Sequence, residues 1–596
     1  MYPLKKLTCL ATGGLWLWTS ALCAQGQPVS TEARRKALND LLAEQWEYSL
    51  RVSPIKASFL GDKRWNDQLD DFSQAAIDRD LQETQKFLTR FEAINTTGFP
   101  DQEALNKALI VRDLKLQMEG ARFKPWEMPI EQQNGVQVWL PDLVNVLSFA
   151  TVKDYEDYIS RLKQVPRVLD QITVMARKGM HDGLMPPKFL LEESLEQCKT
   201  TAMAPMEKST FAQPFFKFPA NIPPAEQGRL RAAGLAAVKG SVLPAFVRFT
   251  VFLKDEYVPQ GRSEPGIWAL ADGDARYQYL IQAMTTTVKT PDEIHQVGLK
   301  EVAEIEEQML EVAHQLGYQD LAKLNEHIKT DRKFYATTGQ QLLDLYSGYV
   351  KHMEPELPKL FGRLPKAKLV VIPMEASRSP QAVPADYTSG TASGSRPGHI
   401  NVNEYDPLHR LLLNAEAIAY HEGIPGHHLQ LSIAEELEGL PEFRRYEGYT
   451  AFVEGWALYS ERLGKEVGMY QDPYSNYGRL ENEMWLAIRL VVDTGVHSKH
   501  WTRQQMVDYF HKYTAMDEPN VQTEVDRYIA WPAQALAYKL GQLEILKLRQ
   551  LAKDALGERF DIRAFHDEVL DEGALPLNVL DGQVTDWVNT QKSAMK

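Results

Sequence analysis

Apolar residues recur at intervals of three and four along most of this chain, which is the spacing of one face of an α-helix. The pattern runs through residues 31–50, 154–180, 226–255 and 291–315. Such stripes normally pack in a core, and a chain of 596 residues can bury a large one. We therefore predict a mainly α-helical fold.

One region departs from helical spacing. Residues 368–404 begin with a β-branched run and continue with glycine, serine and proline. Near their end, residues 399–403 (His-Ile-Asn-Val-Asn) alternate between polar and apolar side chains. This composition predicts a small β element of short strands joined by a glycine-rich loop. The glycines lack the spacing of a phosphate-binding loop, which argues against nucleotide binding. Because the segment precedes a histidine motif, it is either the rim of a substrate cleft or a plain surface loop.

The N-terminus has the plan of a secretory signal peptide. Lysines at positions 5 and 6 precede an apolar run over residues 7–22, and Ala24 is a small residue before polar sequence. We predict cleavage after Ala24, so that residues 1–24 are the signal peptide. The alternative is an uncleaved N-terminal membrane anchor, because the run is nearly long enough to span a bilayer. A lipoprotein at Cys23 is disfavoured because Leu22 is bulky where such sites need a small residue.

The cysteine content indicates the cellular compartment of the protein, and its net charge limits the classes of binding partner. Cys198 is the single cysteine of the mature chain, so an exported protein must rely on its core rather than on an internal disulfide. A Gram-negative periplasm suits it best. The formal net charge of −14 argues against nucleic acid and anionic membrane as partners, and no second apolar run of spanning length is expected. We predict an N-terminal helical lobe over residues 25–290 and a catalytic lobe over 291–596, within one fold.

Residues 421–428, His-Glu-Gly-Ile-Pro-Gly-His-His, read as an interrupted zinc-binding helix. In the zinc motif H-E-x-x-H, two histidines four residues apart lie about 6 Å apart on one helix face. Here Pro425 takes the second position, and proline cannot donate the backbone hydrogen bond to His421. Gly426 frees the backbone to bulge. We predict that this insertion distorts the helix and returns His427 to the metal.

His428 is the alternative second ligand. It follows His421 by seven residues and shares its face, but a straight helix would place it about 10 Å further along the axis. Two imidazoles that far apart cannot bind one ion, so the geometry favours His427 and leaves His428 as the competitor.

Counting across the next turn gives a third ligand. We predict a helix from His427 to about residue 438, a turn near residue 440, and an antiparallel helix beyond it. Glu454 is then level with His427, and Glu461 lies seven residues later on the same face. Apolar neighbours indicate that Glu454 is buried, and a buried carboxylate needs a partner. We predict one zinc ion on His421, His427 and Glu454, with Glu461 as an outer partner of a ligand imidazole.

Two histidines and one carboxylate with an open position are typical of a catalytic zinc site. Glu422, which follows the first ligand, would deprotonate the zinc-bound water and later deliver the proton to the leaving amine.

These motifs resemble those of the bacterial proteins grouped as domain of unknown function 885. Their hallmark H-E-x-x-P-G-H is matched by residues 421–427, and E-G-W-A-x-Y-x-E by residues 454–461. The resemblance covers nearly the whole mature chain. That family is similar to helical zinc peptidases, which include thimet oligopeptidase, neurolysin and the H-E-x-x-H carboxypeptidases. The resemblance implies a two-lobed helical body with a deep channel, zinc at its floor, and cleavage of short peptides rather than folded proteins.

Two C-terminal stretches also resemble the family pattern. Arg489, Asp493 and His497 are spaced by four and therefore share one helix face. By resemblance, His497 and Tyr538 would donate hydrogen bonds to the developing oxyanion, Asp493 would be an outer partner, and Arg489 would bind substrate. The alternative for Arg489 and Asp493 is a structural ion pair.

Residues 527–539 supply further candidates for substrate binding. If cleavage proceeds from the C-terminus, a basic side chain must hold the substrate carboxylate, and Arg527 and Lys539 are candidates. Tyr528 and Gln534 either line the same site or close a helix start around Pro532.

The sequence therefore predicts a zinc-dependent metallopeptidase that hydrolyses short peptides, with carboxypeptidase or dipeptidyl-carboxypeptidase action as one form. A second hypothesis is a metal-dependent amidase acting on non-ribosomal or cyclic peptides or other small amides, because substrate choice lies in the cleft walls. A third is a non-catalytic periplasmic protein that binds peptides or metal, but such a protein has no need of a base at Glu422.

Overall fold

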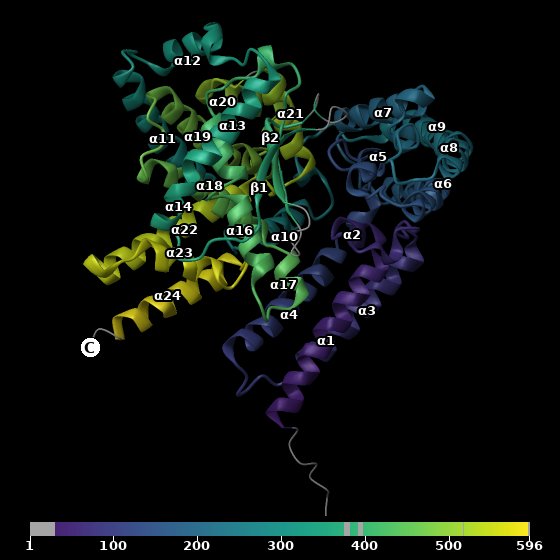
Figure 1. The fold of residues 1–596 in the computed structure, drawn as a ribbon, viewed down its shortest axis with the longest axis horizontal. Helices are drawn as coiled ribbons and strands as arrows, with labels where there is room; N and C mark the ends of the chain where they lie inside the picture. The colour runs from purple at the N-terminus through teal and green to yellow at the C-terminus, as the bar shows by residue number, and fades with distance from the viewer. Residues whose placement is uncertain (1–29, 375–378, 380–381, 391–396, 517, 594–596) are drawn as a thin grey trace, which may run out of the picture.

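The computed structural model describes residues 30–374, 379, 382–390, 397–516 and 518–593. The predicted signal peptide lies outside the described residues. Within them the chain is mainly α-helical with one small sheet, as predicted (Figure 1).

Helices follow one another from the start of the described chain to residue 285. They are α1 (Thr31–Val52), α2 (Pro54–Phe59), α3 (Gln74–Glu92), α4 (Asp101–Ala121), α5 (Val136–Val146), α6 (Val152–Asp182), α7 (Lys188–Met203), α8 (Pro224–Ala237), α9 (Leu243–Phe252) and α10 (Gly273–Thr285). The helix predicted over 226–255 is present, but it contains two π-helical turns, over residues 238–242 and 253–257.

The helices beyond residue 290 carry both histidine and glutamate motifs. They are α11 (Pro291–Gln315), α12 (Leu321–Thr330), α13 (Gly339–Met353), α14 (Leu357–Leu360), α15 (Ala415–Glu422), α16 (His427–Glu436), α17 (Glu442–Tyr446), α18 (Thr450–Glu466), α19 (Pro473–Ser498), α20 (Arg503–Tyr513), α21 (Glu518–Ala530), α22 (Leu536–Leu556), α23 (Ile562–Leu570) and α24 (Leu577–Ser593). The prediction for 291–315 is confirmed by α11.

The predicted β element is a three-stranded sheet of β1 (Leu369–Pro373), β2 (Ala385–Thr388) and β3 (Gly398–Val402). Its order is β1-β3-β2, with β1 parallel and β2 antiparallel to β3. Ile400 of the central strand pairs with Val371 on one side and Tyr387 on the other. Residues 391–396 of the predicted glycine-rich loop lie outside the described residues.

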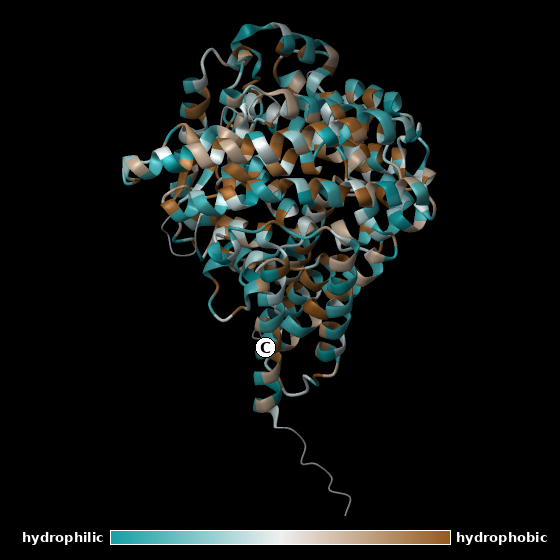
Figure 2. Cartoon of the chain, turned by 90° about the vertical axis from the view of Figure 1, so that its right-hand side faces the viewer, coloured by the Kyte–Doolittle hydropathy of each residue, from teal (hydrophilic) through white to brown (hydrophobic). Residues whose placement is uncertain are grey.

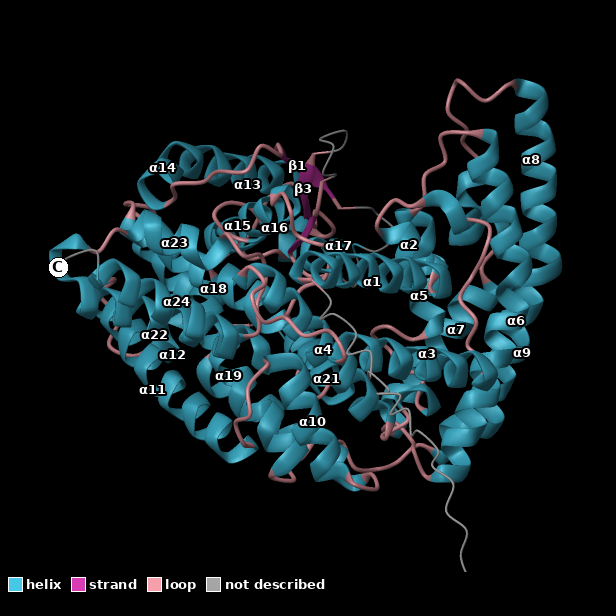
Figure 3. Ribbon diagram, turned by 90° about the horizontal axis from the view of Figure 1, so that it is seen from below, coloured by secondary structure: helices cyan, strands magenta, loops and turns pink. Residues whose placement is uncertain are grey.

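The hydrophobic clusters show how the helices are assembled. The first cluster joins residues 38–114 of α1, α3 and α4 to residues 353–588 of the C-terminal half. A second cluster holds the α6–α9 group together, and this group stands to one side of the other helices in Figures 1 and 3. A third is centred on α11, α19 and α21. The lobe boundary at residue 290 stays a prediction, because the first cluster draws on both sides of it.

The segment from Pro224 to Gln260 differs from the sequence prediction in one respect. By length and composition it is apolar enough to cross a membrane, although no second run of spanning length was expected. Its inward side chains, such as Phe246 and Phe249, pack in the cluster with α6, while Val247 and Val251 are about half exposed. Apolar and polar residues are mixed along the helices in Figure 2. The packing of one face is that of a core helix.

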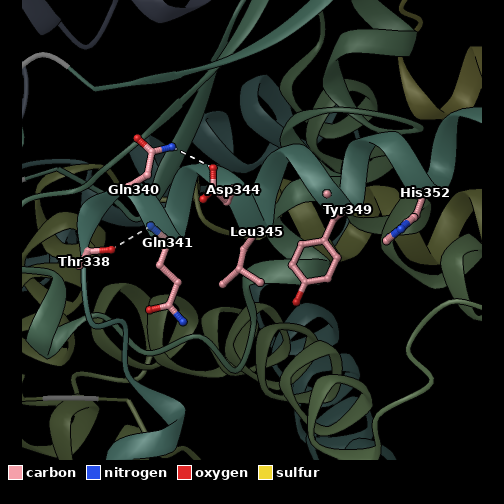
Figure 4. Close-up of a pocket in the computed structure, with 8 residues that line it drawn as sticks. Thr338, Gln340, Gln341, Asp344, Leu345, Tyr349 and His352 are labelled. Atoms are coloured by element: carbon pink, nitrogen blue, oxygen red, sulfur yellow. Dashed lines mark hydrogen bonds between the residues drawn. The ribbon is translucent and has the colours of Figure 1, made fainter.

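Four cavities of the described residues lie away from the predicted zinc ligands. One of about 410 Å³ runs along α13, where Gln340 donates a hydrogen bond to Asp344 (Figure 4). Another of about 750 Å³ lies between the N-terminal helices and α10, lined among others by Asp80 and Tyr279. Because none of the four is lined by the predicted ligands, the deep channel over the zinc stays a prediction.

Candidate metal centre

Three predicted ligands come together between α15, α16 and α18. His421 is the penultimate residue of α15, His427 is the first of α16, and Glu454 lies in the first two turns of α18. Their ligand atoms all lie within 4.8 Å of one another. Oε2 of Glu454 is 3.7 Å from Nε2 of His421 and 3.4 Å from Nε2 of His427. Both imidazoles are nearly buried, whereas the Glu454 side chain is 21% exposed, so the carboxylate is the most exposed of the three ligands.

These spacings fit a bound zinc ion. Imidazole nitrogen and carboxylate oxygen bind zinc at about 2.0–2.2 Å, so two such atoms on a tetrahedral ion lie about 3.4 Å apart. The distances of 3.4 and 3.7 Å are close to this spacing and exceed the usual hydrogen-bond length of about 2.9 Å. Two imidazoles and one carboxylate are also a donor set that zinc favours, with one position left open.

The local backbone explains how a seven-residue motif brings two histidines together. Helix α15 ends at Glu422, and the N–H of Gly426 donates to the carbonyl of Tyr420 across the break at 2.9 Å. A Cβ at position 426 would lie 2.0 Å from the carbonyl oxygen of His421, so only glycine fits. The carbonyl of Pro425 accepts a hydrogen bond from Nε1 of Trp456 at 2.9 Å, which ties the first motif to the second.

Glu454 reaches His427 by a different path from the predicted one. The sequence predicted one helix running from residue 441 through Glu454, but α17 ends at Tyr446 and α18 begins at Thr450. The helix predicted before His421 is also shorter, since α15 begins at Ala415 and residues 410–412 are extended against residues 334–336. The count across the turn nevertheless places Glu454 beside His427, because α16 and α18 still pack against each other.

The outer shell of His421 contains Glu461. Nδ1 of His421 lies 2.8 Å from Oε1 of Glu461, and Nδ2 of Asn482 donates to the same oxygen at 2.8 Å. A carboxylate on Nδ1 leaves Nε2 as the atom available to a metal. Sequence reasoning missed Asn482, because no spacing within the chain connects α19 with Glu461.

His428 is turned away from the three ligands. Its Nδ1 lies 2.9 Å from the hydroxyl of Tyr387 on β2, and its Nε2 lies 3.2 Å from the carbonyl of Ala367. Burial lowers the pKa of His428 to about 4, so the ring is neutral at pH 7. With one nitrogen engaged by β2 and the other by the chain segment before β1, His428 connects α16 to β2 and is not among the donor atoms that cluster.

Glu422 lies close enough to the ligands for their charges to act on it. Burial raises the pKa of Glu422 to about 7, against the lowering effect of His421 and His427. Burial also disfavours ionised Glu454, but the two imidazoles hold the pKa of that carboxyl well below its usual range. The two carboxyl groups therefore differ in protonation near neutral pH, with one fixed as an anion and the other able to exchange a proton.

His497 and Asp493 lie away from the centre, and both predicted roles are wrong. His497 is fully buried; its Nδ1 accepts from the N–H of Ile267, and its Nε2 donates to the carbonyl of Tyr528. No N–H is left for an oxyanion. Asp493 accepts hydrogen bonds from the Tyr277 hydroxyl at 2.5 Å and from the backbone N–H at position 533. It therefore contacts neither ligand imidazole and joins α19 to α10.

The predicted role of Lys539 in binding the substrate carboxylate is also wrong. Its side chain is fully buried, and its Nζ lies 3.0 Å from Glu483, 3.1 Å from Glu301 and 2.8 Å from Gln542. An ammonium group has three N–H donors, and all three are satisfied inside the protein. Lys539 therefore cannot bind a substrate carboxylate without breaking these contacts.

The other predicted substrate residues gather around one buried carboxylate. Arg489 pairs with Glu524 at 3.1 Å rather than with Asp493, and its Nε donates to the hydroxyl of buried Tyr528. Gln534 contacts the hydroxyl of Tyr538 at 3.4 Å, and both are partly exposed. Sequence reasoning missed Glu524. The proposed oxyanion role of Tyr538 stays a prediction.

Helices α18 and α22 approach closely beside Glu454. A Cβ at Gly541 of α22 would lie 1.8 Å from the carbonyl oxygen of Ala451, and one at Gly455 would lie 2.5 Å from Gly541. These two glycines allow the backbones to touch and so fix the position of the neighbouring ligand.

We expect Gly541→Ala to lower the free energy of unfolding by about 1–3 kcal/mol, because the methyl group forces α22 away from α18. Zinc affinity should fall with it, since Glu454 moves with α18. Gly582→Ala is the matched control: it lies within α24 with open space around its Cβ, and we expect a gain of about 0.5–1 kcal/mol. Urea unfolding measures both changes. Equal stability of the two variants would show that the glycine contact is not required.

Comparisons with known proteins agree with this architecture. A family model described as "Bacterial protein of unknown function (DUF885)" matches residues 54–584. A solved structure described as a "putative lipoprotein" from Colwellia psychrerythraea is 28% identical, covers 94% of this chain and 99% of its own, and has a TM-score of 0.88. A "putative lipoprotein of unknown function" from Shewanella oneidensis is 16% identical, covers 93% and 99%, and has a TM-score of 0.71, so it shows the fold alone.

A comparison with curated proteins gave no significant match. The family match extends over most of the chain and includes every residue of the centre described above. The protein therefore belongs to the bacterial family DUF885.

Proposed function

We propose that this protein is a zinc-dependent peptidase that hydrolyses short peptides. The observation that supports it most is the convergence of two imidazoles and one carboxylate at the spacing of zinc ligands, with Glu422 alongside them. His421, His427 and Glu454 would hold the ion. Zinc would supply a Lewis acid that polarises the amide carbonyl and acidifies water.

The remaining chemistry is assigned to residues of the chain. Glu422 is the general base: its side chain makes no hydrogen bond to any residue in the described part of the chain, and its pKa of about 7 suits proton transfer near neutral pH. The same carboxyl can return the proton to the leaving amine. Glu461 orients the His421 ring and, with Asn482, keeps its Nε2 directed at the ligand position.

We also propose that the protein is exported and acts in the cell envelope, most simply in the periplasm. Two observations support this location: the signal-like pattern of residues 1–24, and the description of the 28% identical structure as a lipoprotein. A peptidase in that compartment would meet short peptides as they are imported or released.

The test is peptide cleavage with and without metal. The purified mature chain is incubated with a mixed peptide library, and the products are read by mass spectrometry. We expect chelation to reduce cleavage by more than about 100-fold, and one equivalent of zinc to restore it, because the ion supplies both polarisation and an acidified water. Cleavage that survives complete removal of metal would refute the proposal, and so would zinc binding without cleavage of any peptide.

A further inference from the structure

Two buried arginines share one carboxylate in the C-terminal half. Arg489 of α19 is 3% exposed, and Arg527 of α21 has a side chain that is 16% exposed. Nη2 of Arg489 lies 3.1 Å from Glu524, and Nε of Arg527 lies 3.6 Å from the same carboxylate. Among the described residues, Glu524 is the only acid within ion-pair distance of either arginine. The cluster therefore carries one positive charge in excess.

Several guanidinium atoms of this cluster lack acceptors. Nη1 of Arg489, together with Nε and Nη2 of Arg527, is buried and has no hydrogen-bond partner within the described part of the chain. A buried donor on a charged group is costly when it is left unsatisfied. The planar fork of arginine matches a carboxylate, which can accept two parallel hydrogen bonds. One added carboxylate would satisfy these donors and balance the excess charge, whereas a dianion would exceed it.

The surroundings hold the Arg489 guanidinium in a fixed position. The rings of Trp485 and Tyr538 each lie 4.6 Å from its central carbon. The Tyr528 hydroxyl accepts from Nε of Arg489 at 2.8 Å and donates to Glu524 at 2.5 Å. Cation–π contacts and a fixed Nε leave the free Nη1 edge in one orientation, which is the preorganisation that a binding site needs.

The cluster borders the surface of the protein. Trp485, Gln534, Tyr538 and Arg527 are each partly exposed, whereas the residues beneath them are buried. The free Nε and Nη2 atoms of Arg527 belong to the more exposed of the two arginines. These guanidinium atoms are themselves buried, so a ligand would reach them by displacing the partly exposed side chains that surround them.

The metal centre and the arginine cluster share their supporting helices. Helix α19 carries Asn482, which binds Glu461 behind the ligand His421, and it carries Arg489 seven residues later. Seven residues are two turns, so both side chains lie on one face about 10 Å apart along the axis. Helix α22, which carries Tyr538, packs along α18, which carries the ligand Glu454.

We propose that Arg489 and Arg527 bind the C-terminal carboxylate of the peptide substrate, so that the protein removes short fragments from peptide C-termini. This inference rests on the proposed peptidase function and adds its substrate class: peptides with a free C-terminal carboxylate. The reaction is ordinary hydrolysis, in which one water molecule is consumed and a new amine and a new carboxylate are formed.

The test compares one library of N-acetylated tetrapeptides as free acids with the same library as C-terminal amides. We expect the wild-type protein to cleave the acids at least about 100-fold faster in kcat/KM, because the amides cannot pair with the guanidinium groups. Arg527→Gln should lower cleavage of the acids by about 30-fold or more and leave cleavage of the amides unchanged, with Arg527→Lys intermediate. Arg527 is chosen over Arg489 because it makes fewer contacts in the interior.

Arg503→Gln is the matched control. Arg503 of α20 forms an ion pair at 2.5 Å with Asp526, which lies on α21 next to Arg527 but outside the cluster. Loss of Arg503 should leave the acid-to-amide ratio unchanged. Equal cleavage of acids and amides by the wild-type protein would overturn the inference while leaving the peptidase proposal standing. An equal loss on both libraries in Arg527→Gln would also overturn it, because it would indicate structural damage.

A binding measurement separates failure of this inference from failure of the proposed function. If no tetrapeptide is cleaved, zinc-loaded protein is dialysed to equilibrium against both libraries, and the bound peptides are weighed by mass spectrometry. Retention of acids at least about 10-fold above amides, lost in Arg527→Gln, would support the carboxylate pocket even though the peptidase proposal had failed. Equal retention of both libraries would overturn the pocket.

Discussion

Glu422→Gln should reduce kcat for peptide cleavage by about 1,000-fold or more while zinc remains bound. Glutamine keeps the size of the side chain but cannot accept a proton, and general-base catalysis contributes about 100- to 10,000-fold. His421, His427 and Glu454 are unchanged in this variant, so zinc content should stay near one ion per chain. Single-turnover cleavage together with metal analysis checks both expectations. Retained turnover in zinc-loaded Glu422→Gln would remove Glu422 from the mechanism.

The pKa of Glu422 adds a pH signature to the same variant. Burial raises this pKa above the ordinary glutamate value, so in the metal-free protein the folded state holds the proton more tightly than the unfolded state. The associated stability is present at low pH and is lost as pH rises through about 7. At pH 8 the metal-free Glu422→Gln protein should therefore be at least as stable as the wild type. Glu438→Gln, at an exposed site after α16, should change neither kcat nor stability.

The helices and the small sheet were predictable because apolar residues repeat at different intervals in helices and in strands. Helix α11 begins and ends where the apolar spacing predicts, and its start carries a capping box at Thr290 and Glu293. The three strands fall inside the one region without helical spacing. The break between α17 and α18 was not predicted, because residues 447–449 contain one glycine within an otherwise continuous helical pattern.

The candidate site was predictable where its residues lie close along the chain. Pro425 and Gly426 predict the interruption between α15 and α16. Counting residues across the turn that follows α16 spans a short stretch of chain, so it identifies Glu454 despite the irregular connection. The residues from α19 onward needed long-range packing, which spacing does not report. His497 and Arg489 share a helix face, yet one bonds to backbone in the interior and the other meets Glu524 on α21. Only the packing of α21 against α19 distinguishes them.

His427→Ala should abolish zinc binding under conditions in which His428→Ala retains it. His427 supplies one of three ligand atoms, and its loss leaves two donors, so zinc affinity should fall by far more than the 10- to 100-fold that follows loss of an outer partner. Peptide cleavage should fall with it. The stabilisation by excess zinc, worth about 4 kcal/mol at a thousand times the Kd, should disappear from thermal unfolding curves.

His428→Ala tests the opposite assignment on the neighbouring residue. Both nitrogens of His428 are engaged by β2 and by the carbonyl of Ala367, so its loss should cost about 1–3 kcal/mol of stability through unsatisfied buried groups. Zinc affinity should stay within a few-fold of the wild type, because the three donor atoms are untouched. The reverse pattern, with zinc lost in His428→Ala and kept in His427→Ala, would require α16 to rotate by about 100° and would refute the ligand set. The two adjacent histidines are therefore controls for each other. Both are buried residues of helix α16, but His427 faces the other ligands and His428 faces β2.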